Sequence, residues 1–142
     1  MRQGFPSNLA RGITDSACVS DSEVLRCAYT FDKRLGLDGR RELSIQWLDD
    51  AQAEKEMKSR LRKGEPTYIR GFAVLRTDEL DQVCKEQEYY GLTYERNKSM
   101  NNPYHGLIKM NEVEDKMARK MITSELALRS TFYPYEARLP VG

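Results

Sequence analysis

The chain has 142 residues, which is enough for one domain that buries a continuous core without a metal ion or a disulfide. Apolar residues make up 39% of it and charged residues 32%, and its aromatic and branched side chains are too numerous for a disordered protein. Lys and Arg number 23 against 22 Asp and Glu, so the net charge of +1 gives no overall attraction to nucleic acid or to an anionic membrane. Any such binding has to come from a local patch.

The three cysteines, Cys18, Cys27 and Cys84, are odd in number and show no C-x-x-C spacing, and the chain holds a single histidine. This pattern predicts neither a zinc site nor a disulfide framework, and we expect no cofactor. There is no run of about 18 apolar residues, and the N-terminus lacks the apolar core of a secretory signal. We therefore expect a cytoplasmic protein without membrane association, and the oligomeric state is left open.

The first residues contain no sustained period. Residues 1–21 mix Gly, Pro, Ser and Asn, which predicts a flexible N-terminal arm. Residues 23–31 fit a strand or a short helix equally well, because Ser22 could cap a helix while Thr30 and Phe31 favour β-structure.

The next two elements have clear periods. Apolar and polar residues alternate over residues 43–47, which predicts a half-buried strand. An amphipathic helix rich in Lys, Glu and Arg follows Asp49, which stands in a capping position, and Gly64 and Pro66 should end it.

The longest apolar run covers residues 68–75 and predicts a strand at the middle of the sheet, covered on both faces. Thr77 is positioned to cap a short helix after it. Alternation then resumes over residues 92–95, and residues 104–110 are expected to form a fourth strand after a polar loop.

The C-terminal part begins with a helix capped by Asn111. Its apolar stripe, which includes the pair Met117 and Met121, is interpreted as core rather than as a partner groove. The remaining residues, 131–142, form a tail that contains Pro134. Its aromatic residues suit an extended segment laid on the domain or on a partner. These aromatic residues are Phe132, Tyr133 and Tyr135.

The order of elements predicts an α+β fold, with one mixed sheet of about four strands and about three helices packed on it. The single domain should span residues 22–130, between the flexible arm and the aromatic tail.

Two sets of residues are candidates for chemistry. His105, with Tyr104 beside it, lies in a loop before a strand and could act as a general acid or base. The alternative is a structural histidine whose ring hydrogen-bonds a backbone carbonyl. No serine-hydrolase, metalloprotease, P-loop or dinucleotide motif is present, and the cysteines Cys27 and Cys84 are interpreted as buried structural thiols rather than as nucleophiles.

A basic patch near the end of the predicted helix is the best nucleic-acid candidate. Arg60, Arg62, Lys63 and Arg70 supply positive charge, and Tyr68 could stack on a base. Glutamates are interleaved with these residues, and cations in the last turn of a helix are favourable without any ligand, so a solvated helix face is the alternative.

Four short blocks carry a resemblance to known sequences. They are Val24-Leu25-Arg26, Leu43-Ser44-Ile45, the Gly-Phe-Ala-Val-Leu run at 71–75, and the Asn-Pro-x-His-x-x-Ile block at 102–108. In this order they resemble a loose set of short uncharacterised bacterial proteins, over residues 22–110. The resemblance implies that the His105 block is an ordered feature, and it implies no activity.

Three functions follow from these observations. We first expect an accessory or binding protein that acts with a larger protein partner, because the chain is small, lacks catalytic motifs and has an apolar tail. The second is a small enzyme acting on a nucleotide or RNA, with His105 as acid or base and Arg70 or Arg76 neutralising phosphate. The third is weak, salt-sensitive nucleic-acid binding through residues 55–70.

Overall fold

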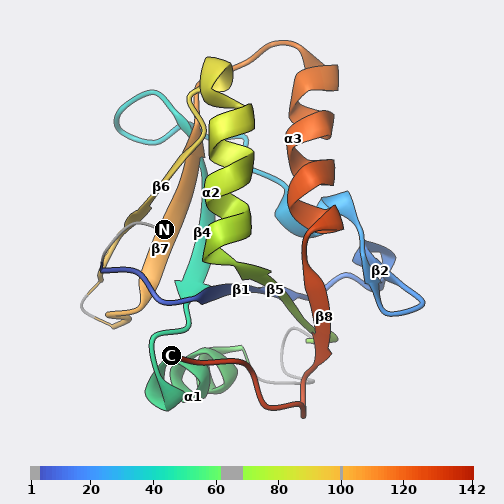
Figure 1. Ribbon diagram of the computed structural model, residues 1–142, viewed down its shortest axis with the longest axis vertical. Coiled ribbons are helices and arrows are strands. Elements are labelled where there is room, and N and C mark those ends of the chain that lie inside the picture. The colour runs from blue at the N-terminus through green and yellow to red at the C-terminus, as the bar shows by residue number, and fades with distance from the viewer. Residues whose placement is uncertain (1–3, 62–68, 100) are drawn as a thin grey trace.

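The computed structural model describes residues 4–61, 69–99 and 101–142. Its main feature is a six-stranded sheet with the strand order β6-β7-β4-β1-β5-β8, in which each neighbouring pair runs antiparallel (Figure 1). The strands are β1 (Asn8–Ile13), β4 (Arg41–Trp47), β5 (Gly71–Arg76), β6 (Thr93–Arg96), β7 (His105–Met110) and β8 (Thr131–Pro134). A separate two-stranded hairpin pairs β2 (Val19–Ser20) with β3 (Glu23–Val24).

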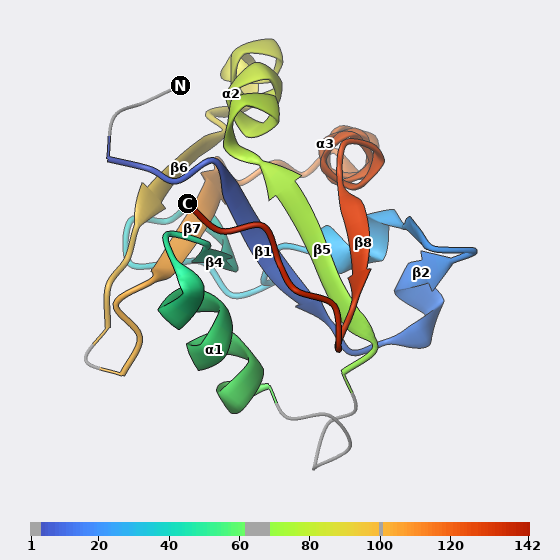
Figure 2. The same ribbon diagram turned by 60° about the horizontal axis from the view of Figure 1, so that its bottom comes forward.

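Helices cover both faces of the sheet. The α-helices are α1 (Ala51–Arg60), α2 (Thr77–Glu86) and α3 (Lys116–Leu128), and the short 3₁₀ helices are η1 (Ser16–Cys18), η2 (Arg26–Tyr29) and η3 (Glu88–Tyr90). Helices α2 and α3 lie side by side on one face, and α1 lies on the other (Figures 1 and 2).

Because successive side chains of a strand point to opposite faces, the sheet divides the core in two. The larger core lies under α2 and α3 and contains Leu9, Trp47 and Ile122. The smaller core lies under α1 and contains Met57 and Phe72. The expected α+β class and three α-helices are confirmed. The expected four-stranded mixed sheet is wrong, because the sheet has six strands and its pairs are antiparallel.

One additional strand comes from the segment expected to be a flexible arm. Residues 8–13 form β1, which lies between β4 and β5 in the middle of the sheet. Phe5 packs against Trp47 with their ring centroids 4.8 Å apart, and the Arg96 side chain donates to the Gly4 carbonyl oxygen at 2.8 Å. The prediction of an arm over residues 1–21 is therefore wrong for the part from Gly4 onward, where the backbone and Phe5 are held by long-range contacts.

The other additional strand comes from the predicted tail. Residues 131–134 form β8, which pairs with β5 at the edge of the sheet. Phe132 packs against the larger core, and Tyr133 and Tyr135 pack against the smaller one. The Tyr135 hydroxyl also donates to the Lys58 carbonyl oxygen at 3.1 Å. The three aromatic residues thus pack within the chain, and the domain extends beyond residue 130.

Several local expectations are confirmed and several need correction. Strands at residues 43–47 and 105–110 and the helix α1 are present. Residues 23–31 contain both alternatives, the short strand β3 and the 3₁₀ helix η2. Strand β5 is internal and its residues 71–75 are buried, but β4 and β1 occupy the middle of the sheet. The Thr77 hydroxyl donates to the Pro6 carbonyl oxygen instead of capping α2.

Helix α3 differs most from its prediction. It begins at Lys116, where Asp115 rather than Asn111 is the capping residue and accepts from the Met117 amide at 2.9 Å. Its buried face consists of Ala118, Ile122, Leu126 and Ala127. Met117 and Met121 are 70% and 43% exposed, so their assignment to the core is wrong.

Two of the cysteines are bonded to each other. Cys18 and Cys27 form a disulfide across nine positions, and Cys84 is half-buried outside it. The expectation of no disulfide, and of a buried thiol at Cys27, is therefore wrong, because folding of η1 and η2 brings the two Cα atoms to 5.3 Å. None of the helices in the described ranges is long and apolar enough to cross a membrane.

Candidate anion-binding site

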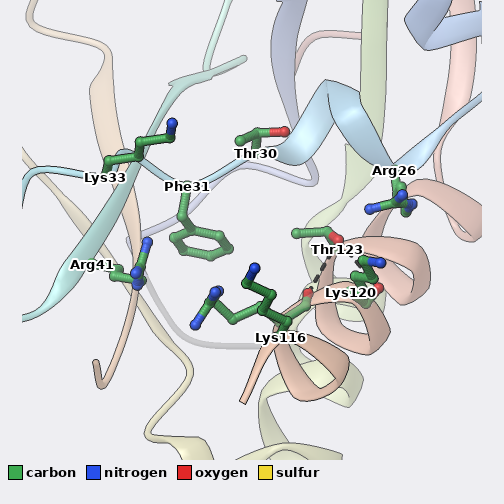
Figure 3. Close-up of a pocket in the computed structure, with 9 residues that line it drawn as sticks. Arg26, Thr30, Phe31, Lys33, Arg41, Lys116, Lys120 and Thr123 are labelled. Atoms are coloured by element: carbon green, nitrogen blue, oxygen red, sulfur yellow. Dashed lines mark hydrogen bonds between the residues drawn. The ribbon is translucent and has the colours of Figure 1, made fainter. Parts of the chain in front are cut away.

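A pocket of about 510 Å³ opens between α3, the segment around η2 and the start of β4 (Figure 3). We call it the basic pocket. Its nine lining residues are Arg26, Thr30, Phe31, Lys33, Arg41, Lys116, Arg119, Lys120 and Thr123. Six of these carry positive charge and none carries negative charge. In Figure 3 the residues numbered 26 to 33 approach from the η2 segment, and Lys116, Lys120 and Thr123 approach from α3.

The η2 wall of the basic pocket is held by buried contacts. Tyr29 is fully buried, and its hydroxyl forms a 2.6 Å hydrogen bond with Ser130 just beyond α3. Burial raises the pKa of Tyr29 to about 12, so the phenol stays neutral at physiological pH. From β1, Arg11 donates to the Ala28 carbonyl oxygen at 2.7 Å, and the disulfide fixes Cys27 next to Arg26. These contacts preset the position of the pocket wall.

Four of the six cations have no partner of opposite charge among the described residues. Across residues 4–61, 69–99 and 101–142, no ion pair or side-chain hydrogen bond involves the charged groups of Arg26, Lys33, Lys116 or Lys120. All four are exposed. Their fields add in the same pocket, which makes it attractive to anions.

The other two cations, Arg41 and Arg119, have partners that hold their guanidinium groups at the pocket. Arg41 forms an ion pair with Glu112 at 3.0 Å, and its Nε is buried without a hydrogen-bond partner among the described residues. Arg119 donates to the Val113 carbonyl oxygen. The Glu112 carboxylate and the carbonyl oxygens of Asp32 and Val113 orient these guanidinium groups, and the carboxylate offsets one of the six positive charges.

The position of the cations on α3 is unfavourable for the helix itself. Lys116, Arg119 and Lys120 lie in its first two turns, and its first turn contains no acidic residue. The N-terminal end of a helix carries partial positive charge, so cations there destabilise it, while an anion would be stabilised by the helix end and the side chains together. The placement of these three cations therefore does not stabilise α3, whose N-terminal end is capped by the Asp115 carboxylate.

The structure places the predicted catalytic pair at a different site. His105 is the first residue of β7, and its Nδ1 lies 2.9 Å from the Asn97 carbonyl oxygen, so Nδ1 must donate and the neutral ring carries its lone pair on Nε2. His105 lines a pocket of about 300 Å³ next to α1, and the described residues of this pocket also include Arg11 and Arg60 but no carboxylate. Tyr104 lies beside it, and burial together with the Asp50 carboxylate raises the pKa of its hydroxyl.

Of the predicted nucleic-acid patch, only part lies in the described residues. Arg60 forms an ion pair with Glu56 at 3.1 Å, and Arg70 is exposed just before β5. Arg62, Lys63 and Tyr68 lie outside the described residues. Arg60 is at the C-terminal end of α1, where a cation is favourable without a ligand, in contrast to the cations of α3.

The basic pocket was missed at the sequence level because its cations come from three separate parts of the chain. The one local signal was the run Lys116, Arg119 and Lys120 directly after Asp115. Cations at this end of a predicted helix conflict with the helix dipole, and that conflict could have marked them.

The fold and the pocket define only a class, an antiparallel α+β domain with an exposed cationic pocket. No known protein family matches this chain, and comparisons with curated proteins and with solved structures also found no match. The resemblance to short bacterial proteins therefore stays a prediction. Within the described ranges, no group of three or more His, Cys, Asp and Glu side chains is placed to hold a metal ion.

Proposed function

We propose that this protein is a binding protein whose basic pocket holds a polyanionic part of a larger partner. The observation that carries the proposal is the set of four unpaired cations, two of which sit at the unfavourable end of α3. Unpaired like charges gathered in one pocket repel each other, and a polyanion relieves that repulsion.

Binding has more support than catalysis. The basic pocket offers charge and two threonine hydroxyls, but no carboxylate, histidine or cysteine that could act as acid, base or nucleophile. His105, the basis of the enzyme alternative, lines a different pocket in which both arginines already have partners. Nucleic-acid binding through residues 55–70 has the weaker charge set, since Arg60 is paired with Glu56.

The proposal concerns an anionic ligand and leaves the location of the protein open. Cytoplasmic localisation remains a prediction, and the Cys18–Cys27 disulfide counts against it, because disulfides persist mainly in oxidising compartments.

The test is binding of inorganic polyphosphate, used as a general polyanion, to a charge-reversed double variant. We expect K116E/K120E to bind at least about tenfold more weakly at low salt, and the wild-type affinity to fall as salt is raised. The same variant should melt at an equal or higher temperature than the wild type, because two glutamates suit the N-terminal end of α3. Titration calorimetry and thermal melting measure the two effects.

The matched control is K55E/K98E, which makes the same change in net charge at exposed lysines outside the basic pocket. Its polyphosphate affinity should stay within about twofold of the wild type. Equal losses in both double variants would contradict a localised site, and so would an unchanged affinity in K116E/K120E.

A further inference from the structure

Helix α3 presents an apolar stripe to solvent next to the basic pocket. Met117 is 70% exposed, Met121 43% and Leu128 73%. These residues are spaced at i, i+4 and i+11, which places them on one face of the helix. Exposed large apolar side chains that are grouped in this way mark an interaction surface more often than single ones do.

A second pocket continues this surface toward the C-terminal end of α3. It has a volume of about 330 Å³, and we call it the apolar hollow. Its lining residues are Glu23, Val24, Leu25, Arg26, Ser124, Ala127 and Leu128. Arg26 lines both this hollow and the basic pocket, and along α3 the hollow begins at Ser124, directly after Thr123 of the basic pocket. The two pockets, together with the exposed side chains of Met117 and Met121 on the same helix, form what we call the α3 groove.

The residues that line the α3 groove come from α3 on one side and from the chain around β3 and η2 on the other. Helix α3 lies beside η2 (Figure 1). The 13 residues of α3 give it a length of ~20 Å, which suits a peptide segment rather than a small ion. Its chemistry changes along this length. The end at Lys116 is cationic, and the end at Leu128 is mainly apolar and holds Glu23 and Arg26.

We propose that the α3 groove binds a peptide segment of a partner protein that has acidic residues at one end and apolar residues at the other. This inference rests on the proposed function and names the class of its ligand. The acidic end lies in the basic pocket, and the apolar end covers Leu128, Met121 and the apolar hollow. The direction of the segment is fixed because Lys116, Arg119 and Lys120 lie at one end of the α3 groove and Glu23 lies at the other.

The same chemistry argues against other occupants. A nucleic acid would leave the apolar half of the α3 groove without a complementary group, because its phosphates are spaced along its whole length. A second copy of this chain would bring two sets of unpaired cations together across a symmetric interface. A peptide of mixed character satisfies both halves.

The experiment compares two labelled 14-residue peptides of identical composition by fluorescence anisotropy. One carries four Glu at one end and three Leu at the other, and its control has these residues evenly interspersed. We expect the wild-type protein to bind the segregated peptide at least about tenfold more tightly than the interspersed one. The triple variant M117S/M121S/L128S should lose this preference and keep its affinity for inorganic polyphosphate. Its three positions are exposed, so the fold should remain, as thermal melting would show.

The control is L37S/Y89S, which removes two even more exposed apolar side chains outside the α3 groove and should keep the preference. Equal binding of the two peptides, or a preference that survives M117S/M121S/L128S, would overturn the inference and leave the proposed function intact. The triple variant could instead keep its affinity for the peptide and lose affinity for single-stranded DNA or for phosphatidylserine vesicles. That result would also overturn the inference. A polyphosphate affinity that is unchanged in K116E/K120E would overturn the proposed function itself.

Discussion

Glu54 shows how one side chain joins distant parts of this chain. It lies on α1, and its Oε2 accepts from the Leu139 amide and from Lys58 Nζ, each at 2.9 Å. Lys58 in turn donates to the Ala137 carbonyl oxygen at 2.7 Å. Burial by itself raises the pKa of Glu54, but the hydrogen bonds from Leu139 and Lys58 and the nearby positive charges bring the pKa below its ordinary value. The C-terminal segment is therefore held most firmly while Glu54 is ionised.

Stability should consequently depend on the ionisation of Glu54. Because its pKa is lower in the folded state than the ordinary 4.5, its contribution is present above that pH and is lost as the pH falls through the folded pKa. We expect the free energy of unfolding of E54Q to be about 1 to 2 kcal/mol lower than that of the wild type at pH 7. This difference in free energy should narrow in acid. Urea unfolding at pH 7 and below pH 4.5 measures this. E88Q, at an exposed glutamate of η3, should show a smaller gap at pH 7, and an E54Q gap that is constant with pH would contradict the assignment.

At the scale of elements, the disulfide and η2 determine how well the basic pocket is formed. The bond closes a short loop between η1 and η2, and Arg26, Thr30 and Phe31 lie next to its second cysteine. Phe31 is only 6% exposed and anchors this segment in the larger core. The pocket wall therefore depends on one covalent bond and one buried ring.

Removal of the bond should affect both stability and binding. In C18S/C27S the unfolded chain regains the entropy of a loop of about ten residues, which lowers the free energy of unfolding by about 2 to 3 kcal/mol. The looser wall should also weaken polyphosphate binding several-fold. Chemical denaturation and calorimetry, with and without dithiothreitol, measure both effects.

The internal control for that comparison is Cys84. C84S keeps the disulfide, so its polyphosphate affinity should fall on reduction as that of the wild type does, while C18S/C27S should not respond to dithiothreitol. Polyphosphate binding that is equal in the oxidised protein, the reduced protein and C18S/C27S would show that the bond does not position the basic pocket.

At the scale of the whole molecule, the two ends of the chain close the fold together. The Ser7 amide donates to the Gly142 carbonyl oxygen, and the Gly142 amide donates to that of Leu48, each at 3.0 Å. Residues 131–142 also supply the edge strand β8 and the buried Leu139. The residues after β8 thus cover part of the α1 face of the sheet (Figure 2).

Deletion of residues 131–142 should therefore lower the melting temperature strongly, because it uncovers the smaller core and the edge of β5. The milder variant L139A should cost about 2 to 4 kcal/mol, as expected for a fully packed leucine. V141A, at a 39% exposed position of the same segment, should stay close to the wild type. Circular dichroism melts report all three, and a deletion that melts like the full chain would show that the segment does not contribute to stability.

The sequence by itself determined the elements whose residues repeat with a clear period. Alternation identified β4 and β6, and helical spacing identified α1, because each pattern is read within one turn or one strand. It also determined the α+β class. Strand β1 was not recognisable in this way, since Arg11 interrupts its apolar residues. The Arg11 guanidinium donates to the carbonyl oxygens of Ala28 and Ser44, which are 17 and 33 positions away.

Only the tertiary structure decided the strand number, the disulfide and the candidate site. The register of β4 with β7 and the packing of η2 against α3 bring Arg26, Arg41 and Lys116 to one pocket, although they are far apart in the chain. Met117 and Met121 had the right spacing for core, but Ile122 and Leu126 face the sheet and leave the methionines in solvent. Local periodicity shows that a helix has an apolar face. Which apolar residues are buried depends on the surface against which the helix packs.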